Sequence, residues 1–122
     1  MSYLNKIHII GNITQSPQFN TTQNGNSVVN LNVATNENWT NKHGEKQQET
    51  EYHLVTAWGK TAEFVRDYCD KGHMIYVEGR KQTKPYPSTT PGGEQIERHR
   101  CEIIASKLIK LSKDDNYGRS ND

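Results

Sequence analysis

Alternating apolar residues in the first third of the chain predict β-strands. Residues 4–13 alternate imperfectly, and Gly11 within them indicates a bulge or a bend. Turn-forming residues then flank a possible short strand at residues 18–20. Residues 27–36 form the next long segment, with three apolar side chains on one face: Val29, Leu31 and Val33. Two long strands are therefore expected before residue 37.

A polar stretch separates these strands from the third one. Residues 37–50 show no apolar periodicity, and we expect them to form a flexible hairpin loop. Residues 51–58 form the third strand, in which His53 lies on one face and four other side chains lie on the opposite face: Tyr52, Leu54, Thr56 and Trp58. This strand therefore has an aromatic ring near each end of one face.

One segment has the spacing of an α-helix. Residues 61–71 carry an apolar stripe made by four side chains: Phe64, Val65, Tyr68 and Cys69. Gly72 follows at a position that commonly ends a helix. Residues 73–84 and 95–111 are expected to form two further strands, joined by a proline- and glycine-rich loop at 85–94.

This order of elements predicts an all-β domain with one short helix. Three strands, a helix and two strands match the OB-fold, a five-stranded Greek-key barrel with its helix between strands 3 and 4. Such a barrel needs few apolar residues, because each strand supplies one inward face. We expect the domain to span residues 1–112 and to be followed by a short polar, disordered tail at 113–122.

Composition and charge narrow the function only slightly. Hydrophobic residues make up 31% of the chain and the mean hydropathy is −0.98, which favours short strands or oligomerisation. The formal net charge is +1, but residues 80–112 carry +4 and the remainder carries −3. This local basic stretch is a weak indication of nucleic-acid binding. No apolar run is long enough to span a membrane and no signal peptide is evident, so we expect a cytoplasmic protein.

The sequence lacks the patterns expected of an enzyme. Its five histidines do not have the spacing of a metal site, and no glycine-rich phosphate loop follows a strand. Cys69 and Cys101 are isolated, and we expect both to be reduced and buried. We therefore expect a binding protein that uses no metal or other cofactor.

Aromatic residues in polar surroundings give the clearest indication of function. Four rings stand in such settings: Trp39, Tyr52, Trp58 and Tyr86. On the fourth strand, Arg80, Gln82 and Lys84 share a face that continues towards the last of these rings. Exposed rings interleaved with cations suit single-stranded nucleic acid, because bases stack on the rings and cations follow the phosphates. Ordinary packing of the rings and a solvated basic face remain the alternatives.

Four blocks of the sequence follow the pattern of a known family in collinear order: "NKIHIIGNIT", "VVNLNVATNENW", "ETEYHLVTAWGKTAEFVRDYCDKGHMIYVEGRKQT" and "EIIASKLIKL". Over about residues 1–112 they resemble the bacterial single-stranded DNA-binding protein family. The most specific parts are "ATNENW", "WGKTAE" and "KGHMIYVEGR". The resemblance implies an OB-fold, a homotetramer, and sequence-tolerant binding of single-stranded DNA in replication, recombination and repair, in the cytoplasm at the nucleoid.

The resemblance also implies a set of site residues. Stacking rings are expected at Trp39, Tyr52, Trp58 and Tyr86. Phosphate contacts are expected from Lys6, Lys60, Arg80 and Lys84. The resemblance implies a contact between subunits at His53, and we expect further contacts between subunits at His8 and Tyr76. Because His8 interrupts the usual apolar first strand, a place in the core remains the alternative for it. Leu54 and Gln82 stand where basic residues are common in the family, so no phosphate contact is expected from them.

The end of the sequence departs from the family pattern. Family members usually carry a long tail whose acidic, apolar tip recruits replication and repair enzymes. Residues 113–122 have no such tip, so weakened recruitment of these enzymes is expected. The alternative function is that of a primosome-type OB-fold adaptor, which binds proteins and has only weak nucleic-acid binding. The complete set of rings argues against that alternative.

Overall fold

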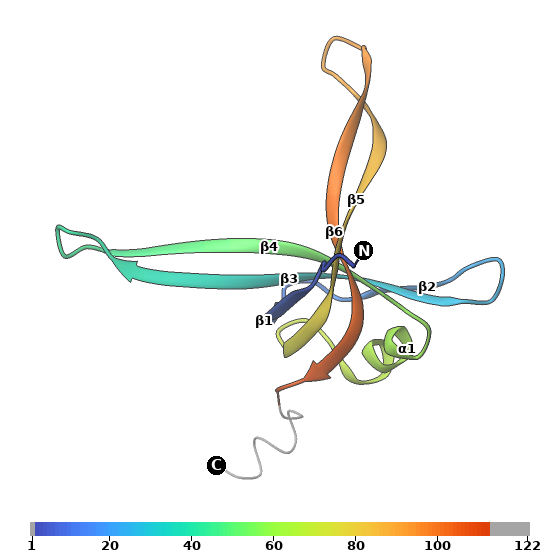
Figure 1. The fold of residues 1–122 in the computed structure, drawn as a ribbon, viewed down its shortest axis with the longest axis horizontal. Coiled ribbons are helices and arrows are strands. Elements are labelled where there is room, and N and C mark those ends of the chain that lie inside the picture. The colour runs from blue at the N-terminus through green and yellow to red at the C-terminus, as the bar shows by residue number, and fades with distance from the viewer. Residues whose placement is uncertain (1, 113–122) are drawn as a thin grey trace.

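Six strands and one helix make up the described part of the chain. The computed structural model describes residues 2–112. The elements follow in the order β1 (Ile7–Ile13), β2 (Gln18–Thr21), β3 (Ser27–Thr40), β4 (Lys46–Trp58), α1 (Gly59–Tyr68), β5 (Met74–Thr89) and β6 (Gln95–Lys110). Three hairpins, β2–β3, β3–β4 and β5–β6, project from a common centre in different directions (Figure 1).

Five of these strands close into a barrel. Neighbouring strands pair in the order β1-β5-β6-β4-β3-β2, and β1 also pairs with β3 through Asn12↔Ala34 and Ile13↔Val33. The β4–β6 pairing is parallel. The short strand β2 lies outside the ring, on the edge of β3. The predicted OB-fold is confirmed, with the helix between the third and fourth strands of the barrel.

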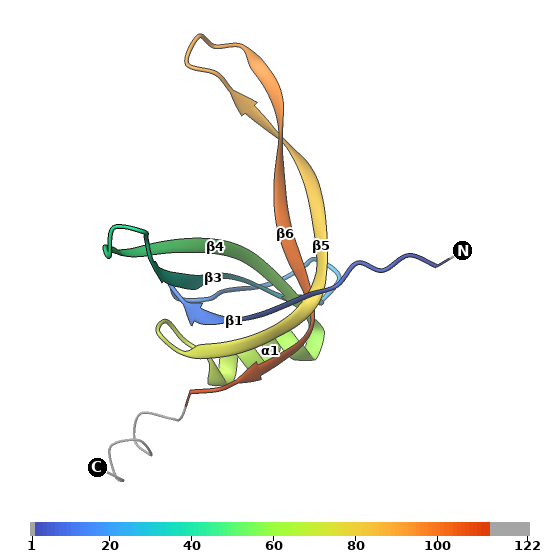
Figure 2. The same cartoon turned by 60° about the vertical axis from the view of Figure 1, so that its left-hand side comes forward.

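The core is formed by one face of each long strand and one side of the helix. Its strand residues include Val29, Leu31, Val33, Val55, Ile75 and Val77. Helix α1 contributes Ala62 and Val65, and Cys69 follows directly after the helix. Figure 2 shows α1 below the barrel, on the side opposite the β5–β6 arm. The predicted apolar stripe is therefore correct at Val65 and Cys69 but wrong at Tyr68, whose ring is exposed.

Two glycines allow strands to cross closely where the barrel closes. A Cβ atom on Gly11 would collide with the carbonyl oxygen of Ala34 on β3. A Cβ atom on Gly79 would collide with the carbonyl oxygen of Ile104. The bulge or bend predicted at Gly11 is not a bulge, because the β1–β5 register continues through it without a shift. The irregularity lies instead between Glu78 and Gly79, in the β5–β6 pairing.

The predicted loop at residues 37–50 is wrong. β3 runs to Thr40, β4 begins at Lys46, and their pairing is continuous up to Thr40↔Lys46. The loop is limited to the residues between them, where the Asn41 side chain accepts hydrogen bonds from the backbone N–H groups of His43 and Glu45. Backbone pairing holds the two polar strands together without a buried face, so no apolar alternation marks them.

The predicted loop at residues 85–94 is also mostly wrong. β5 continues to Thr89, and Pro85 and Pro87 lie opposite His99 and Glu97 of β6. In this arm β5 pairs only with β6, and a strand with one unpaired edge tolerates proline because the missing N–H is not needed on that edge. β5 and β6 therefore form a long two-stranded arm.

Three further expectations need correction or lie outside the structure. The helix ends at Tyr68 rather than at residue 71, because Asp70 and His73 form a turn in which the Asp70 N–H donates to the His73 ring. Cys69 is buried, as expected, but Cys101 is exposed; both thiols are free. The predicted tail at 113–122 lies outside the described residues, so the division at residue 112 stays a prediction.

Candidate nucleic-acid interface

One face of the sheet carries rings and cations on three neighbouring strands. β4 pairs with β6 through Val55↔Ile103 and Thr56↔Ile104, and the β6–β5 register is regular beyond Gly79. Paired residues share a face, and every second residue returns to it. We call the side opposite the core the ring face, with these members: Tyr52, Leu54, Thr56 and Trp58 of β4, Arg98, Arg100, Glu102 and Ile104 of β6, and Arg80, Gln82, Lys84 and Tyr86 of β5.

Three of the four predicted stacking rings lie on the ring face, and none of them belongs to the core. The exposed fraction is 66% for Tyr52, 46% for Trp58 and 36% for Tyr86. A protein that needed these rings only for packing would bury them, because burial of a large aromatic surface is strongly favourable. Their exposure leaves ring surface available to a planar ligand.

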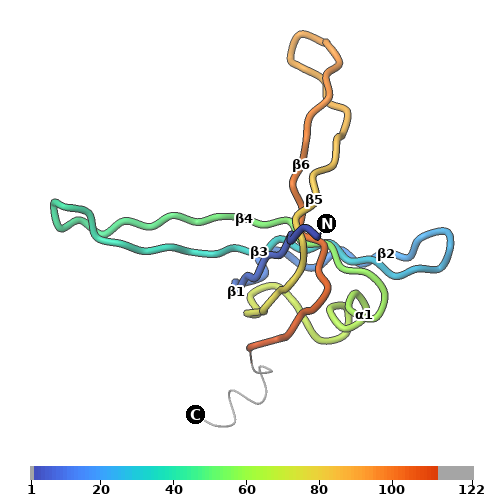
Figure 3. Tube along the Cα trace, viewed as in Figure 1, coloured from blue at the N-terminus to red at the C-terminus, as the bar shows by residue number. Residues whose placement is uncertain are grey.

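Trp39 is exposed as well, but the register places it on the other side of the β3–β4 arm. It pairs with Gln47, whereas its neighbour Asn38 pairs with Gln48. Odd-numbered residues of β4 such as Gln47 continue the core-facing side, away from Tyr52 and Trp58. The structure therefore does not bring Trp39 onto the ring face. A single-stranded nucleic acid that contacts all four rings has to pass around the β3–β4 arm. Figure 3 shows this arm projecting far from the barrel.

Arg100 is a residue of the ring face that the sequence reasoning missed. Its guanidinium carbon lies 5.5 Å from the centroid of the Tyr86 ring, which is a cation–π contact. Arg98 lies next to it on the same face and donates from Nε to Ser88 Oγ. The signal was present in the alternation of Arg98 and Arg100, but their face could be assigned only once the register with β5 was known.

The four predicted phosphate contacts occupy different surroundings. Lys60 is exposed at the start of α1, two residues after Trp58. Arg80 and Lys6 line one surface hollow together with Ile104, so β1 and the ring face meet there. Lys6 also pairs with Glu78, at 3.5 Å between Nζ and Oε2.

Lys84 is the cation most constrained by a carboxylate. Its Nζ lies 3.0 Å from Oε1 of Glu102, a side chain that is only 5% exposed. Within the described residues Oε1 accepts no hydrogen bond, so this ion pair is its one polar contact. A buried carboxylate requires a countercharge. Lys84 therefore supplies that charge, and it is not a free cation like Lys60.

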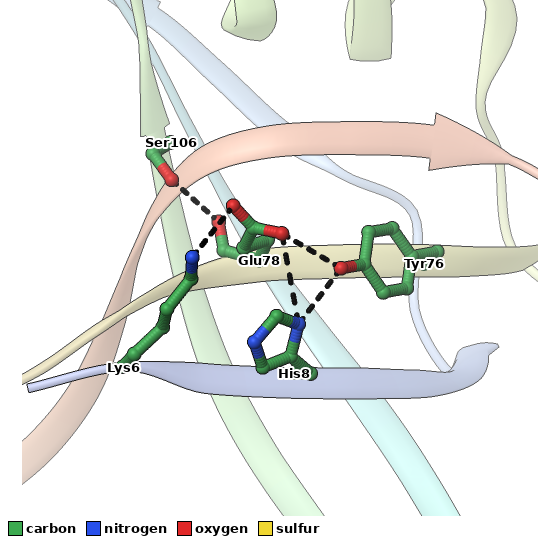
Figure 4. Close-up of polar contacts among 5 residues, drawn as sticks. All are labelled: Lys6, His8, Tyr76, Glu78 and Ser106. Atoms are coloured by element: carbon green, nitrogen blue, oxygen red, sulfur yellow. Dashed lines mark hydrogen bonds and ion pairs between the residues drawn. The ribbon is translucent and has the colours of Figure 1, made fainter.

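Two residues predicted at subunit contacts, His8 and Tyr76, form one polar cluster on the outer side of β1 and β5 (Figure 4). Tyr76 donates its hydroxyl proton to Glu78 Oε1 at 2.8 Å, and His8 Nδ1 lies 2.8 Å from the same hydroxyl. The hydroxyl has only one proton, so Nδ1 is the donor to its oxygen. Ser106 donates to the backbone carbonyl of Glu78. The cluster thus links β1, β5 and β6.

The hydrogen bond between Tyr76 and Glu78 changes the acidity of both groups. It lowers the pKa of the Glu78 carboxyl, and the nearby Lys6 and His8 act in the same direction. It raises the pKa of the Tyr76 hydroxyl, because the phenol keeps the proton that it donates. Both shifts favour the charged carboxylate and the neutral phenol at neutral pH.

His53 lies on the side of β4 opposite the rings, as the alternation predicted. Its Nε2 atom is 3.0 Å from Thr35 Oγ1 on β3. It lines a hollow of about 350 Å³ at the mouth of the barrel, together with Ile7 and Ile9 of β1 and Cys101 of β6. His53 and the His8 cluster therefore lie on different sides of the sheet.

The described part of the chain has neither a metal-binding cluster nor a membrane-spanning helix. Residues 2–112 contain no group of three or more His, Cys, Asp and Glu side chains that could hold a metal ion. Their single helix is too short and too polar to cross a bilayer.

The chain is similar to a known family and to several of its members. The model of the single-strand binding protein family matches residues 4–111. "Single-stranded DNA-binding protein 1" from Chlorobaculum tepidum is 34% identical over 119 residues, covering 98% of this chain and 72% of that protein. "Single-stranded DNA-binding protein" from Neisseria meningitidis serogroup A is 35% identical over 116 residues, covering 94% of this chain and 64% of that protein.

Solved structures with the same fold come from similar proteins. A Plasmodium falciparum SSB in complex with single-stranded DNA superimposes with a TM-score of 0.80 at 27% identity, covering 92% of this chain and 98% of that one. The wild-type single-stranded DNA-binding protein of Thermus aquaticus gives a TM-score of 0.71 at 27% identity, covering 89% of this chain and 50% of that one. The chain thus spans about half of the Thermus protein.

Proposed function

This chain belongs to the single-strand binding protein family, and on that premise we propose that it binds single-stranded DNA with little sequence preference. Bases stack on Tyr52, Trp58 and Tyr86. They also stack on Trp39 where the DNA passes around the β3–β4 arm. Lys60 and Arg80 contact phosphates. Lys6 and Lys84 belong to the same interface, although each already faces a carboxylate. The protein coats single strands in replication, recombination and repair, and acts as a binding protein rather than an enzyme.

The observation that carries this proposal is the ring face itself. Exposed rings on β4 and β5 lie on one surface with Arg80 and Arg100. Stacking accepts any base, because every base has a π-face, and phosphate contacts carry no sequence information.

Assembly into a homotetramer is part of the proposal. The outer side of β1 and β5 around the His8 cluster exposes three apolar side chains: Ile10, Met74 and Ile109. Ile10 and Ile109 both lie opposite Tyr76 in the two pairings of β5. A second copy that covers this surface removes apolar area from water. His8 and Tyr76 then lie at that contact, and His53 lies at a contact near the mouth of the barrel.

The competing function is that of an OB-fold adaptor that binds proteins and has weak affinity for nucleic acid. A protein of that kind does not need exposed rings on several strands, so the ring face favours DNA binding. We place the activity in the cytoplasm, at the nucleoid, where single strands arise. Replication and repair enzymes are the partners that such coated strands would meet.

A competition experiment tests the proposal. Fluorescence anisotropy of a labelled oligo-dT is followed at two salt concentrations, with unlabelled single-stranded and duplex DNA as competitors. We expect single strands to compete far better than duplex at both concentrations, since stacking needs exposed base faces. The affinity should fall with salt, with a slope of about −0.7 per phosphate contact. Equal competition by duplex DNA would show that the interface binds through its positive charge alone, and the proposed stacking would be wrong.

A further inference from the structure

The ring face contains a buried negative charge at its centre. Glu102 lies on β6 between the rings of β4 and the cations of β5, directly opposite Gln82. Its side chain is 5% exposed, while that of Lys84 is 45% exposed. The ammonium therefore reaches the carboxylate from the solvent side and covers it. The pair occupies the surface on which DNA is proposed to lie.

This arrangement limits what Lys84 can do for a nucleic acid. A phosphate that attracts the ammonium away leaves Glu102 buried without a countercharge, and an unpaired buried carboxylate is strongly unfavourable. An ammonium that stays paired with a carboxylate does not neutralise a phosphate, so it displaces no counterion from the DNA. The charge of Lys84 is therefore largely cancelled before DNA arrives.

We propose that Glu102 limits the affinity for DNA: its ion pair with Lys84 prevents Lys84 from contacting phosphate, so the ring face has one fewer cation available to DNA. This inference rests on the proposed binding of single-stranded DNA and adds a specific role to one side chain. It reverses the expectation that each basic residue near the rings adds a phosphate contact. The cations that contribute most to DNA binding are then Arg80 and Arg100 on the ring face and Lys60 at the start of α1.

The direct test is the substitution Glu102→Gln, which replaces the carboxylate with a neutral amide. It keeps the shape of the side chain, removes the countercharge and releases Lys84. Binding to oligo-dT should tighten about three- to tenfold at low salt. The slope of log affinity against log salt should steepen by about 0.7, the value of one added contact to a single strand. Weaker or unchanged binding by a folded Glu102→Gln variant would overturn the proposal.

A matched control separates this effect from a change in net charge. Glu97 lies on the same strand and is exposed. Within the described residues its ion-pair partner is His99, and no lysine pairs with it. Glu97→Gln removes the same formal charge but releases no cation. Its salt slope should stay at the wild-type value. A steepening as large as that of Glu102→Gln would also overturn the proposal.

A second pair of variants keeps the test decisive if Glu102→Gln fails to fold. Lys84→Gln retains a donor for Glu102, and its salt slope should match that of the wild type within about 0.2. Arg80 has no carboxylate partner within residues 2–112 and is proposed to contact phosphate, so Arg80→Gln should make the slope shallower by about 0.7. Equal losses for both variants would show that Lys84 contacts phosphate. If the wild-type protein does not bind oligo-dT, the proposed function fails, and this inference fails with it.

Discussion

A side chain on the ring face should contribute to DNA binding rather than to the stability of the core, and Trp58 tests this. Trp58 is about half exposed and directly precedes the helix. We expect Trp58→Ala to weaken binding of oligo-dT by about 1–3 kcal/mol, which is typical for loss of one stacking ring. Folding should be little affected, because the ring is not in the core cluster. Affinity by anisotropy and melting by circular dichroism measure the two effects separately.

The control for this substitution is Tyr68→Ala. Tyr68 is also an exposed ring, but it lies on α1, away from the ring face. Its loss should leave DNA affinity unchanged. If Trp58→Ala unfolds the domain while Tyr68→Ala does not, Trp58 is a packing residue and its assignment to the interface is wrong.

Glu78 gives a prediction on the pH dependence of stability. Its pKa is lowered in the folded protein, first by the hydrogen bond from Tyr76. A carboxyl whose pKa is lower when folded stabilises the fold above its unfolded pKa, near 4.5, and this stabilisation is lost as the pH falls through the folded value. Carboxyl groups ordinarily titrate between about pH 5 and about pH 3. Over this range the melting temperature of Glu78→Gln should therefore fall less than that of the wild type. Identical acid profiles would contradict this role for the Glu78–Tyr76 contact.

At the scale of strands and arms, backbone packing rather than side-chain pattern decides the geometry. Gly79 lies where β5 passes close to the carbonyl of Ile104. Gly79→Ala should destabilise the domain by about 1–3 kcal/mol, because the added methyl group requires a backbone shift. Gly92→Ala is the control, since its Cβ meets nothing closer than Thr90 Oγ1 at 3.9 Å. Urea unfolding curves of the two variants should differ clearly; similar curves would contradict the close approach.

The elements that sequence could predict are those with a buried face. Val29, Leu31 and Val33 alternate because one side of β3 faces the core, and Val55 and Ala57 do the same for β4. The outer halves of the hairpin arms bury neither face, so their polar residues and prolines resembled loops. The Lys84–Glu102 pair and the contact of Arg100 with Tyr86 depend on the β5–β6 register, which alternation within one strand does not reveal. The same holds for Trp39, whose face depends on the pairing of the β3–β4 arm.

The whole molecule combines two outer surfaces, one proposed for DNA and one for other copies of the chain. The second surface exposes Ile10, Met74 and Ile109 around the His8 cluster. Light scattering at micromolar concentration should give the mass of a tetramer. Ile10→Lys should shift the mass downward, because it places a charge on the apolar contact, whereas Tyr68→Lys on the helix should not. A wild-type monomer at this concentration would remove the proposed assembly.

The central claim is that single-stranded DNA stacks on the ring face, and intrinsic fluorescence tests it most directly. The chain has two tryptophans, Trp39 and Trp58. In a Trp39→Phe variant, all tryptophan emission comes from Trp58 on the ring face. Titration of this variant with oligo-dT should quench most of that emission in a saturable manner. Emission that stays constant while sedimentation shows the DNA bound would contradict the account.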